Sequence, residues 1–178
     1  MNFNFFRSAG FAAGLLIGLI IVVIIFKLAN TNHKASTQYD ERQQVIRGKG
    51  YMYGFYAMMI FEVAMMLLDM SELAVPVEPF ILHFGAILVG ILVLVSYTIW
   101  CGAYWGLNNN RRTYAIVMVI VGLVNAIPVI SSIREGTFMK AGESSAPVIN
   151  LLVLIMLVCV GVVTLIRHIL DTRAEGEN

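Results

Sequence analysis

Charge is scarce in this chain. Only 13% of its 178 residues are Asp, Glu, Lys or Arg, whereas 59% are hydrophobic. Globular domains carry roughly a quarter charged residues, so this composition excludes a soluble fold. The chain also has no His-Glu-x-x-His, Gly-x-Ser-x-Gly, Cys-x-x-Cys or phosphate-binding glycine loop. An intramembrane enzyme thus has no motif behind it, and we expect a protein that is not an enzyme.

Cysteine is equally scarce, with Cys101 and Cys159 as the two examples. Counted along their apolar stretches, the two lie at depths that differ by about 13 Å, which excludes a disulfide between them. Met66 and Met70 have the spacing that soft Cu(I) ligation requires, but methionine more often fills gaps around an awkward polar residue. We expect no metal and no cofactor. No internal repeat is visible either, so an inverted-repeat transporter lacks support.

Long hydrophobic runs are what the chain has instead. Each of five runs approaches the ~20 residues that a helix needs to cross the ~30 Å hydrocarbon core. The sequence therefore predicts an all-α polytopic membrane helix bundle that forms one transmembrane domain over residues 1–178. A cleaved signal peptide is the alternative for the first run, which is longer than the 7–15 apolar residues typical of such peptides. The runs are 9–28, 51–68, 80–104, 113–133 and 147–166.

The basic residues are distributed unevenly, although the net charge is only +1. Nine of the twelve would lie on one side of the membrane. Under the positive-inside rule that side is cytoplasmic, which predicts an outside N-terminus and a cytoplasmic C-terminus. The nine are Lys27, Lys34, Arg42, Arg47, Lys49, Arg111, Arg112, Arg167 and Arg173, and the other three are Arg7, Arg134 and Lys140.

A cytoplasmic connector is expected over residues 30–50. Thr37, followed by Asp40, has the spacing of a helix-capping box. A short helix over residues 38–47 would then lie on the inner leaflet, with its cations near anionic headgroups. Gly48 and Gly50 would supply a flexible bend into the second span. The other cytoplasmic connection contains Asn108 and Asn109, and asparagines there suit a turn with left-handed backbone.

The same connector carries a resemblance. Its two blocks resemble a signature of small multi-helix membrane proteins of Gram-positive bacteria, in which alanine is commoner where Gly50 stands here. The resemblance covers only this connector and the start of the second span. It implies a plasma-membrane location and assigns no activity. A charged interfacial connector is the alternative explanation. The blocks are Tyr39-Asp40-Glu41-Arg42-Gln43 and Ile46-Arg47-Gly48-Lys49-Gly50.

Small residues recur every fourth position in the first span, at Gly10, Gly14 and Gly18. Such a face lets another helix approach closely, so it predicts a helix–helix interface. The partner is a helix of this chain, a second copy or another protein.

Glu62 lies about eleven residues into the second span, which predicts a position near the bilayer midplane. Translocon scales assign about 2.5–3.5 kcal/mol to a charged residue there, so Glu62 is expected to be protonated or paired. Asn125 has a similar depth in the fourth span. With His83 and Asp69 they would line a polar path from outside. The alternatives are a neutral Glu62 bonded between helices, and His83 and Asp69 among the lipid headgroups.

Two functions follow from these features. The first is a plasma-membrane transport component for a small solute or ion, centred on Glu62 and Asn125. The second is a non-catalytic membrane subunit or signalling partner that docks through the glycine face and the connector. The expected partners are the bilayer and either further copies or a membrane or cytoplasmic protein, with no nucleic acid.

Overall fold

Five helices make up the fold in the parts of the chain that the computed structural model describes, residues 3–71, 78–138 and 146–176. The side chains of residues 3–12, 15 and 175–176 are not described further. The helices follow the five predicted apolar runs but are longer at most ends. They are α1 (Phe3–Ala29), α2 (Glu41–Met70), α3 (Pro79–Trp100), α4 (Arg111–Glu135) and α5 (Ala146–Gly176).

Four of these helices, α2 to α5, are long and apolar enough to cross a membrane. In α1, the described residues include a shorter apolar helix, Leu16–Ala29. Large apolar side chains are exposed along all five helices, as expected of surfaces that face lipid. The prediction of an all-α membrane helix bundle is confirmed.

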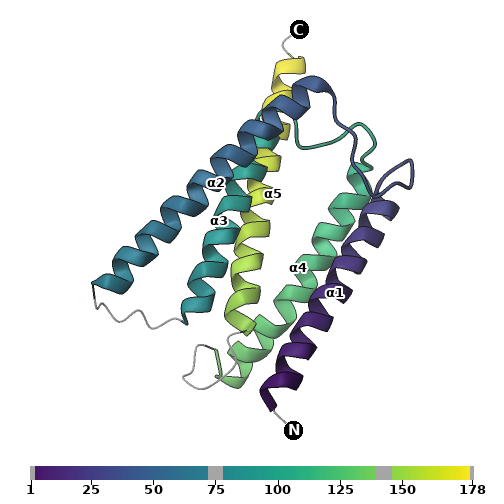
Figure 1. Cartoon of the computed structure of the whole chain (residues 1–178). Coiled ribbons are helices and arrows are strands. Elements are labelled where there is room, and N and C mark those ends of the chain that lie inside the picture. The colour runs from purple at the N-terminus through teal and green to yellow at the C-terminus, as the bar shows by residue number, and fades with distance from the viewer. Residues whose placement is uncertain (1–2, 72–77, 139–145, 177–178) are drawn as a thin grey trace.

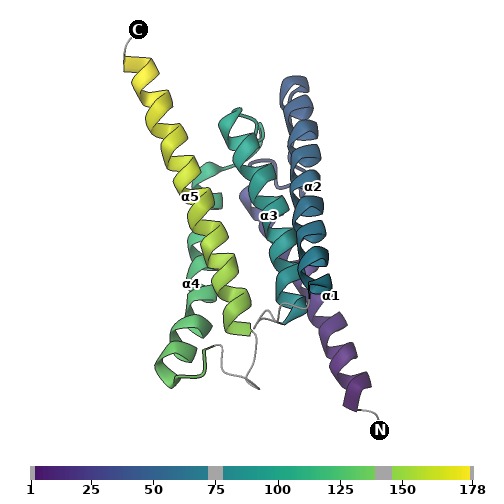
Figure 2. The same cartoon turned by 90° about the vertical axis from the view of Figure 1, so that its left-hand side faces the viewer.

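The helices pack as two pairs that α3 and α5 join. α2 packs along α3, and α4 packs along α5 (Figures 1 and 2). α1 touches α4 and no other helix within the described residues. The two termini lie at opposite ends of the bundle (Figure 1). We call the end formed by residues 30–40 and 101–110 the connector end.

Two glycines create the closest helix crossing. A methyl group on Gly54 of α2 would lie 2.6 Å from the carbonyl oxygen of Gly90 of α3, and one on Gly90 would lie 2.9 Å from that of Gly54. One turn earlier, a methyl group on Gly50 would lie 3.0 Å from the Leu94 side chain and 3.1 Å from the Thr98 side chain. Backbone contact of this kind is what small residues permit between membrane helices.

The separate interfacial helix predicted over residues 38–47 is wrong. α2 begins at Glu41 and runs unbroken to Met70, so those residues form its first turns. The cap is Asp40 rather than Thr37, because the Asp40 carboxylate accepts from the backbone N–H of Gln43, whose side chain bonds back to the backbone of Asp40.

One glycine prediction is wrong, and the alternatives of a second are narrowed. Gly48 and Gly50 lie inside the helix and make no bend, because Gly50 serves the close approach to α3. In α1, nothing lies within 4 Å of a methyl group placed on Gly14 or Gly18. The described residues therefore offer no internal partner for this face. Gly10 lies in the part of α1 whose side chains are not described.

Candidate functional site

Glu62 and His83 form an ion pair or hydrogen bond between two helices. The Glu62 Oε2 atom of α2 lies 2.9 Å from His83 Nδ1 of α3. Two features of the fold bring them together: the close α2–α3 packing, and the antiparallel course of the two helices on either side of the Gly54–Gly90 crossing. The sequence named both residues as members of one polar site, and the structure places them in direct contact.

The pair lies toward the end of the bundle opposite the connector end. His83 is four residues, about 6 Å along the helix axis, from the start of α3 at Pro79. Glu62 lies eight residues, about 12 Å, beyond Gly54, where α2 crosses the middle of α3. Glu62 therefore lies between the helix crossing and that end of the bundle.

Both side chains remain accessible. The exposed fraction is 62% for the His83 side chain and 34% for the Glu62 side chain. An imidazole can donate or accept at each ring nitrogen, and a carboxyl group does either according to its protonation. The contact can therefore persist when a single proton resides on either partner.

Asn125 does not belong to this site. Its Nδ2 atom donates to the carbonyl oxygen of Val121, 2.8 Å away on the same helix. Within the described residues α4 touches neither α2 nor α3, so Asn125 cannot meet Glu62 or His83 in this arrangement. The Asp69 side chain is exposed near the end of α2 and makes no hydrogen bond or ion pair with the described residues. The predicted path of four residues is reduced to one pair.

The connector end holds a second polar group of residues, which the sequence did not predict as a unit. Asn109 Nδ2 donates to Asn30 Oδ1 at 2.7 Å and also reaches the hydroxyl of Tyr114 at 3.3 Å. Asn108 Oδ1 accepts from the backbone N–H of Gln38 at 2.8 Å. Asn30 is 1% exposed and Asn108 is 4% exposed, so both are fully enclosed. We call these contacts the asparagine clamp.

The clamp fixes the two connectors to each other. Asn30 and Asn109 also form a backbone bridge, and the backbone N–H of Leu107 donates to Gln38 at 2.8 Å. A methyl group on Gly106 would lie 2.7 Å from the Gln38 carbonyl oxygen, so glycine is needed for this approach. The predicted turn is present at residues 107–108, but its asparagines do not adopt left-handed backbone, because among the described non-glycine residues only His33 has a positive φ, of 54°.

Residues of the predicted signature take structural roles here. The Gln43 side chain donates to the Trp105 carbonyl oxygen at 3.0 Å, which joins the start of α2 to the 101–110 connector.

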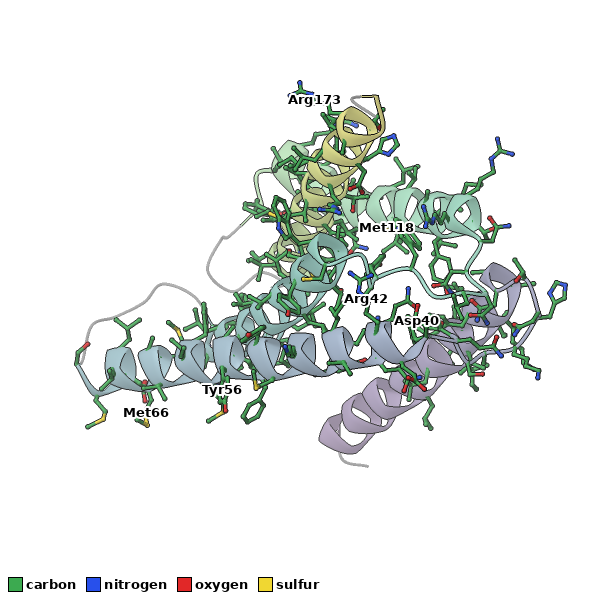
Figure 3. The ribbon with its side chains drawn as sticks, turned by 90° about the horizontal axis from the view of Figure 1, so that it is seen from above. Asp40, Arg42, Tyr56, Met66, Met118 and Arg173 are labelled. Carbon is green, nitrogen blue, oxygen red and sulfur yellow. The ribbon has the colours of Figure 1, made fainter. Side chains whose placement is uncertain are left out.

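Arg47 lies over the ring of Tyr39, 4.1 Å from its centroid. Burial raises the pKa of Tyr39, and Arg47 partly opposes that rise. Arg42, labelled in Figure 3, is exposed at this end, and its side chain donates to the Cys101 carbonyl oxygen at 3.5 Å. Glu41 and Lys49 are exposed.

Metal-binding geometry is not found in the described residues: no three His, Cys, Asp or Glu side chains come together there. Met66 and Met70 are 56% and 74% exposed, and Figure 3 shows Met66 pointing away from the other helices, as Tyr56 does. Cys101 and Cys159 are free thiols, as predicted.

Comparison with known proteins gives no match. No protein-family model, no curated protein and no solved structure matches this chain. The assignment of a function therefore depends on the geometry of the residues alone.

Proposed function

We propose that this chain is a plasma-membrane transport component for a proton, a small cation or a small solute coupled to one, and that Glu62 and His83 form its binding site. The observation that carries the proposal is the 2.9 Å contact between two ionisable side chains on adjacent membrane-spanning helices. Ionisable groups inside membrane spans are costly and are characteristic of ion and proton pathways.

The chemistry of the pair suits a reversible site. In one state an imidazolium donates to a carboxylate, and in the other a neutral imidazole contacts a protonated acid. A small cation can replace the proton on the carboxylate, and His83 then becomes free to turn away. Because the two groups come from different helices, their occupancy is coupled to the α2–α3 contact.

In this proposal the connector end faces the cytoplasm. Nine of the chain's twelve lysines and arginines belong to the helices and connectors of that end. Arg134 belongs to the other end, as do Arg7, whose side chain is not described, and Lys140, which lies outside the described residues. The Glu62–His83 pair then lies toward the outer surface.

Proton flux in vesicles tests the proposal. The purified chain is reconstituted into vesicles loaded with a fluorescent pH indicator, and a pH gradient is applied with a potassium diffusion potential to balance charge. Sodium, potassium and lithium salts are compared. We expect flux above that of protein-free vesicles and its loss in Glu62→Gln. The matched control is Glu135→Gln, an exposed acid at the end of α4. Wild-type flux in Glu62→Gln would exclude the site.

A second candidate function is a non-catalytic membrane subunit. It is favoured by α1, which touches only α4 among the helices and keeps the surfaces around Gly14 and Gly18 open. A transmembrane helix of another chain fits such a surface, because small residues permit close approach.

Purification from native membranes in mild detergent, followed by mass spectrometry, tests this alternative. A stoichiometric partner that is lost in Gly14→Leu or Gly18→Leu supports the subunit, and Gly48→Leu, at an open site on α2, is the control. A chain that purifies alone or with copies of itself favours the transport component.

A further inference from the structure

An apolar groove of about 510 Å³ lies between α4 and α5. Its walls are almost wholly hydrocarbon, with Met118 and Val119 on α4 and Leu157 and Val158 on α5 among them. Gly161 contributes to its width, because nothing lies within 4 Å of a methyl group placed there. The groove runs from Leu154 to His168 on α5, about 21 Å, which is comparable with the depth of one membrane leaflet.

At the connector end the groove meets a polar pocket of about 660 Å³. The two share Tyr104, Trp105, Ala115, Thr164 and His168, so they form one continuous surface. Tryptophan and tyrosine are the side chains that favour the depth of lipid headgroups. The shared residues therefore mark the point at which hydrocarbon gives way to a polar surface.

The polar pocket is cationic. Its lining includes three arginines, Arg111, Arg112 and Arg167, against one carboxylate, Asp171. Arg167 Nη2 pairs with Asp171 Oδ1 at 2.8 Å, and this pair neutralises one of the three charges.

Part of this basic surface has no acceptor in the chain. The Nε atom of Arg167 is buried without a hydrogen-bond partner among the described residues. The Arg112 side chain is exposed and makes no hydrogen bond or ion pair with the described residues. The Arg111 guanidinium lies over the Trp105 ring, 5.9 Å from its centroid. Free guanidinium donors bind phosphate oxygens with a geometry that lysine cannot match.

We propose that this surface is a binding site for an anionic phospholipid, with an acyl tail in the α4–α5 groove and the phosphate at Arg111, Arg112 and Arg167. The combination argues for a lipid rather than for a free phosphate, because a free phosphate would leave the apolar groove uncovered. It also argues against a partner helix, whose end would have to place an anion against the arginines. Basic pockets between membrane helices bind anionic headgroups through these same contacts. The site is independent of the Glu62–His83 pair.

Fluorescence quenching of Trp105 tests the proposal on the full chain in neutral detergent micelles. The chain has two tryptophans, and Trp100→Phe leaves Trp105 as the reporter at the site. Phosphatidylglycerol with brominated tails is compared with phosphatidylcholine that has the same tails. We expect phosphatidylglycerol to reach half-quenching at a mole fraction at least fivefold lower. Trp105→Phe, which leaves Trp100 outside both cavities, should show no headgroup preference.

Two kinds of variant separate the headgroup from the tail. Arg112→Gln should lower the preference for phosphatidylglycerol about fivefold, whereas Arg173→Gln, which lines neither cavity, should not change it. Gly161→Leu should reduce quenching by both lipids, because it fills the groove. Val158→Phe gives a second test of the same point from an exposed position, if Gly161→Leu does not fold.

Four outcomes would overturn the proposal. Equal quenching of Trp105 by the two lipids would remove the headgroup assignment. Loss of the preference on addition of millimolar inorganic phosphate would make the site one for free phosphate. Unchanged quenching in Gly161→Leu and Val158→Phe, or a co-purified helix that excludes both lipids, would remove the tail from the groove.

Discussion

Gly54 and Gly90 place the backbones of α2 and α3 in contact, with each carbonyl oxygen less than 3 Å from the position of a methyl group on the other residue. The contact lies at the middle of α3, and Glu62 and His83 meet on the side of it away from the connector end. A change in the helix separation at this crossing is therefore transmitted directly to the distance between the two ionisable groups.

Gly54→Ala should destabilise the protein. The added methyl group meets backbone rather than a flexible side chain, so the helices must separate, and overpacking of this kind costs about 1–3 kcal/mol. Thermal unfolding in detergent, followed by circular dichroism, measures the effect. Gly48→Ala is the control, because a methyl group there meets nothing within 4 Å. Equal melting temperatures for the two variants would show that the crossing is not tight.

Asn109→Ala should loosen the connector end. The change leaves the backbone N–H of Gly106 without its acceptor, and Asn30 Oδ1 keeps only the hydrogen bond from the Tyr114 hydroxyl. A polar group that is left unpaired in this way costs about 1–3 kcal/mol. Hydrogen–deuterium exchange should rise in residues 30–40. Gln44→Ala, an exposed residue that bonds to the Tyr39 carbonyl, serves as the control, and exchange that rises equally in both variants would argue against the clamp.

Labelling of single cysteines tests the proposed orientation. In a chain with Cys101 and Cys159 replaced by alanine, Arg134→Cys should react with a membrane-impermeant maleimide on intact cells. Lys34→Cys should react only after the membrane is opened. Both positions are exposed in the structure, so accessibility within the protein does not limit either reaction. The opposite pattern would reverse the orientation and place the arginines of the lipid site in the outer leaflet.

Asn125→Leu should retain proton flux. The Asn125 side chain bonds only to the carbonyl of its own helix and lies on α4, which does not touch α2 or α3 in the described structure. The exchange of an amide for an apolar group should also leave the melting temperature close to that of the wild type, because Val121 keeps its backbone donor. Loss of flux in Asn125→Leu would restore Asn125 to the pathway and would indicate that the helices move further than this arrangement allows.

The sequence predicted the helices well because membrane spans have a strong hydropathy signal. Their ends were harder to predict. The α2 helix begins ten residues before Tyr51, because Asp40 and Gln43 cap it in a polar region. Hydropathy does not mark a helix end in such a region. The helix contacts depend on which small residues face one another. Gly54 follows Gly50 by four residues, and Gly90 follows Ala86 by four, which is the same spacing as between the glycines of α1. Spacing alone therefore could not show which of these small-residue faces packs against another helix.

The candidate site was predicted in part for the same reason. Glu62 was identified because a carboxyl group in a membrane span is costly, and His83 because it lies near the outer edge of the next span, on a polar path that would lead inward to Glu62. Depth cannot tell which side of a helix a residue faces, so Asn125 was included although α4 lies elsewhere. The asparagine clamp was missed because its hydrogen bonds join residues 70 or more positions apart.

Exchange of the two ionisable residues tests the central claim most directly. Proton flux is measured in Glu62→His, in His83→Glu and in the double variant that carries both changes. If the contact between a carboxyl group and an imidazole is the site, each single variant should lose flux and the double variant should recover most of it, because the pair is re-formed across α2 and α3. Wild-type flux in the single variants, or none in any protein including the wild type, would contradict the claim.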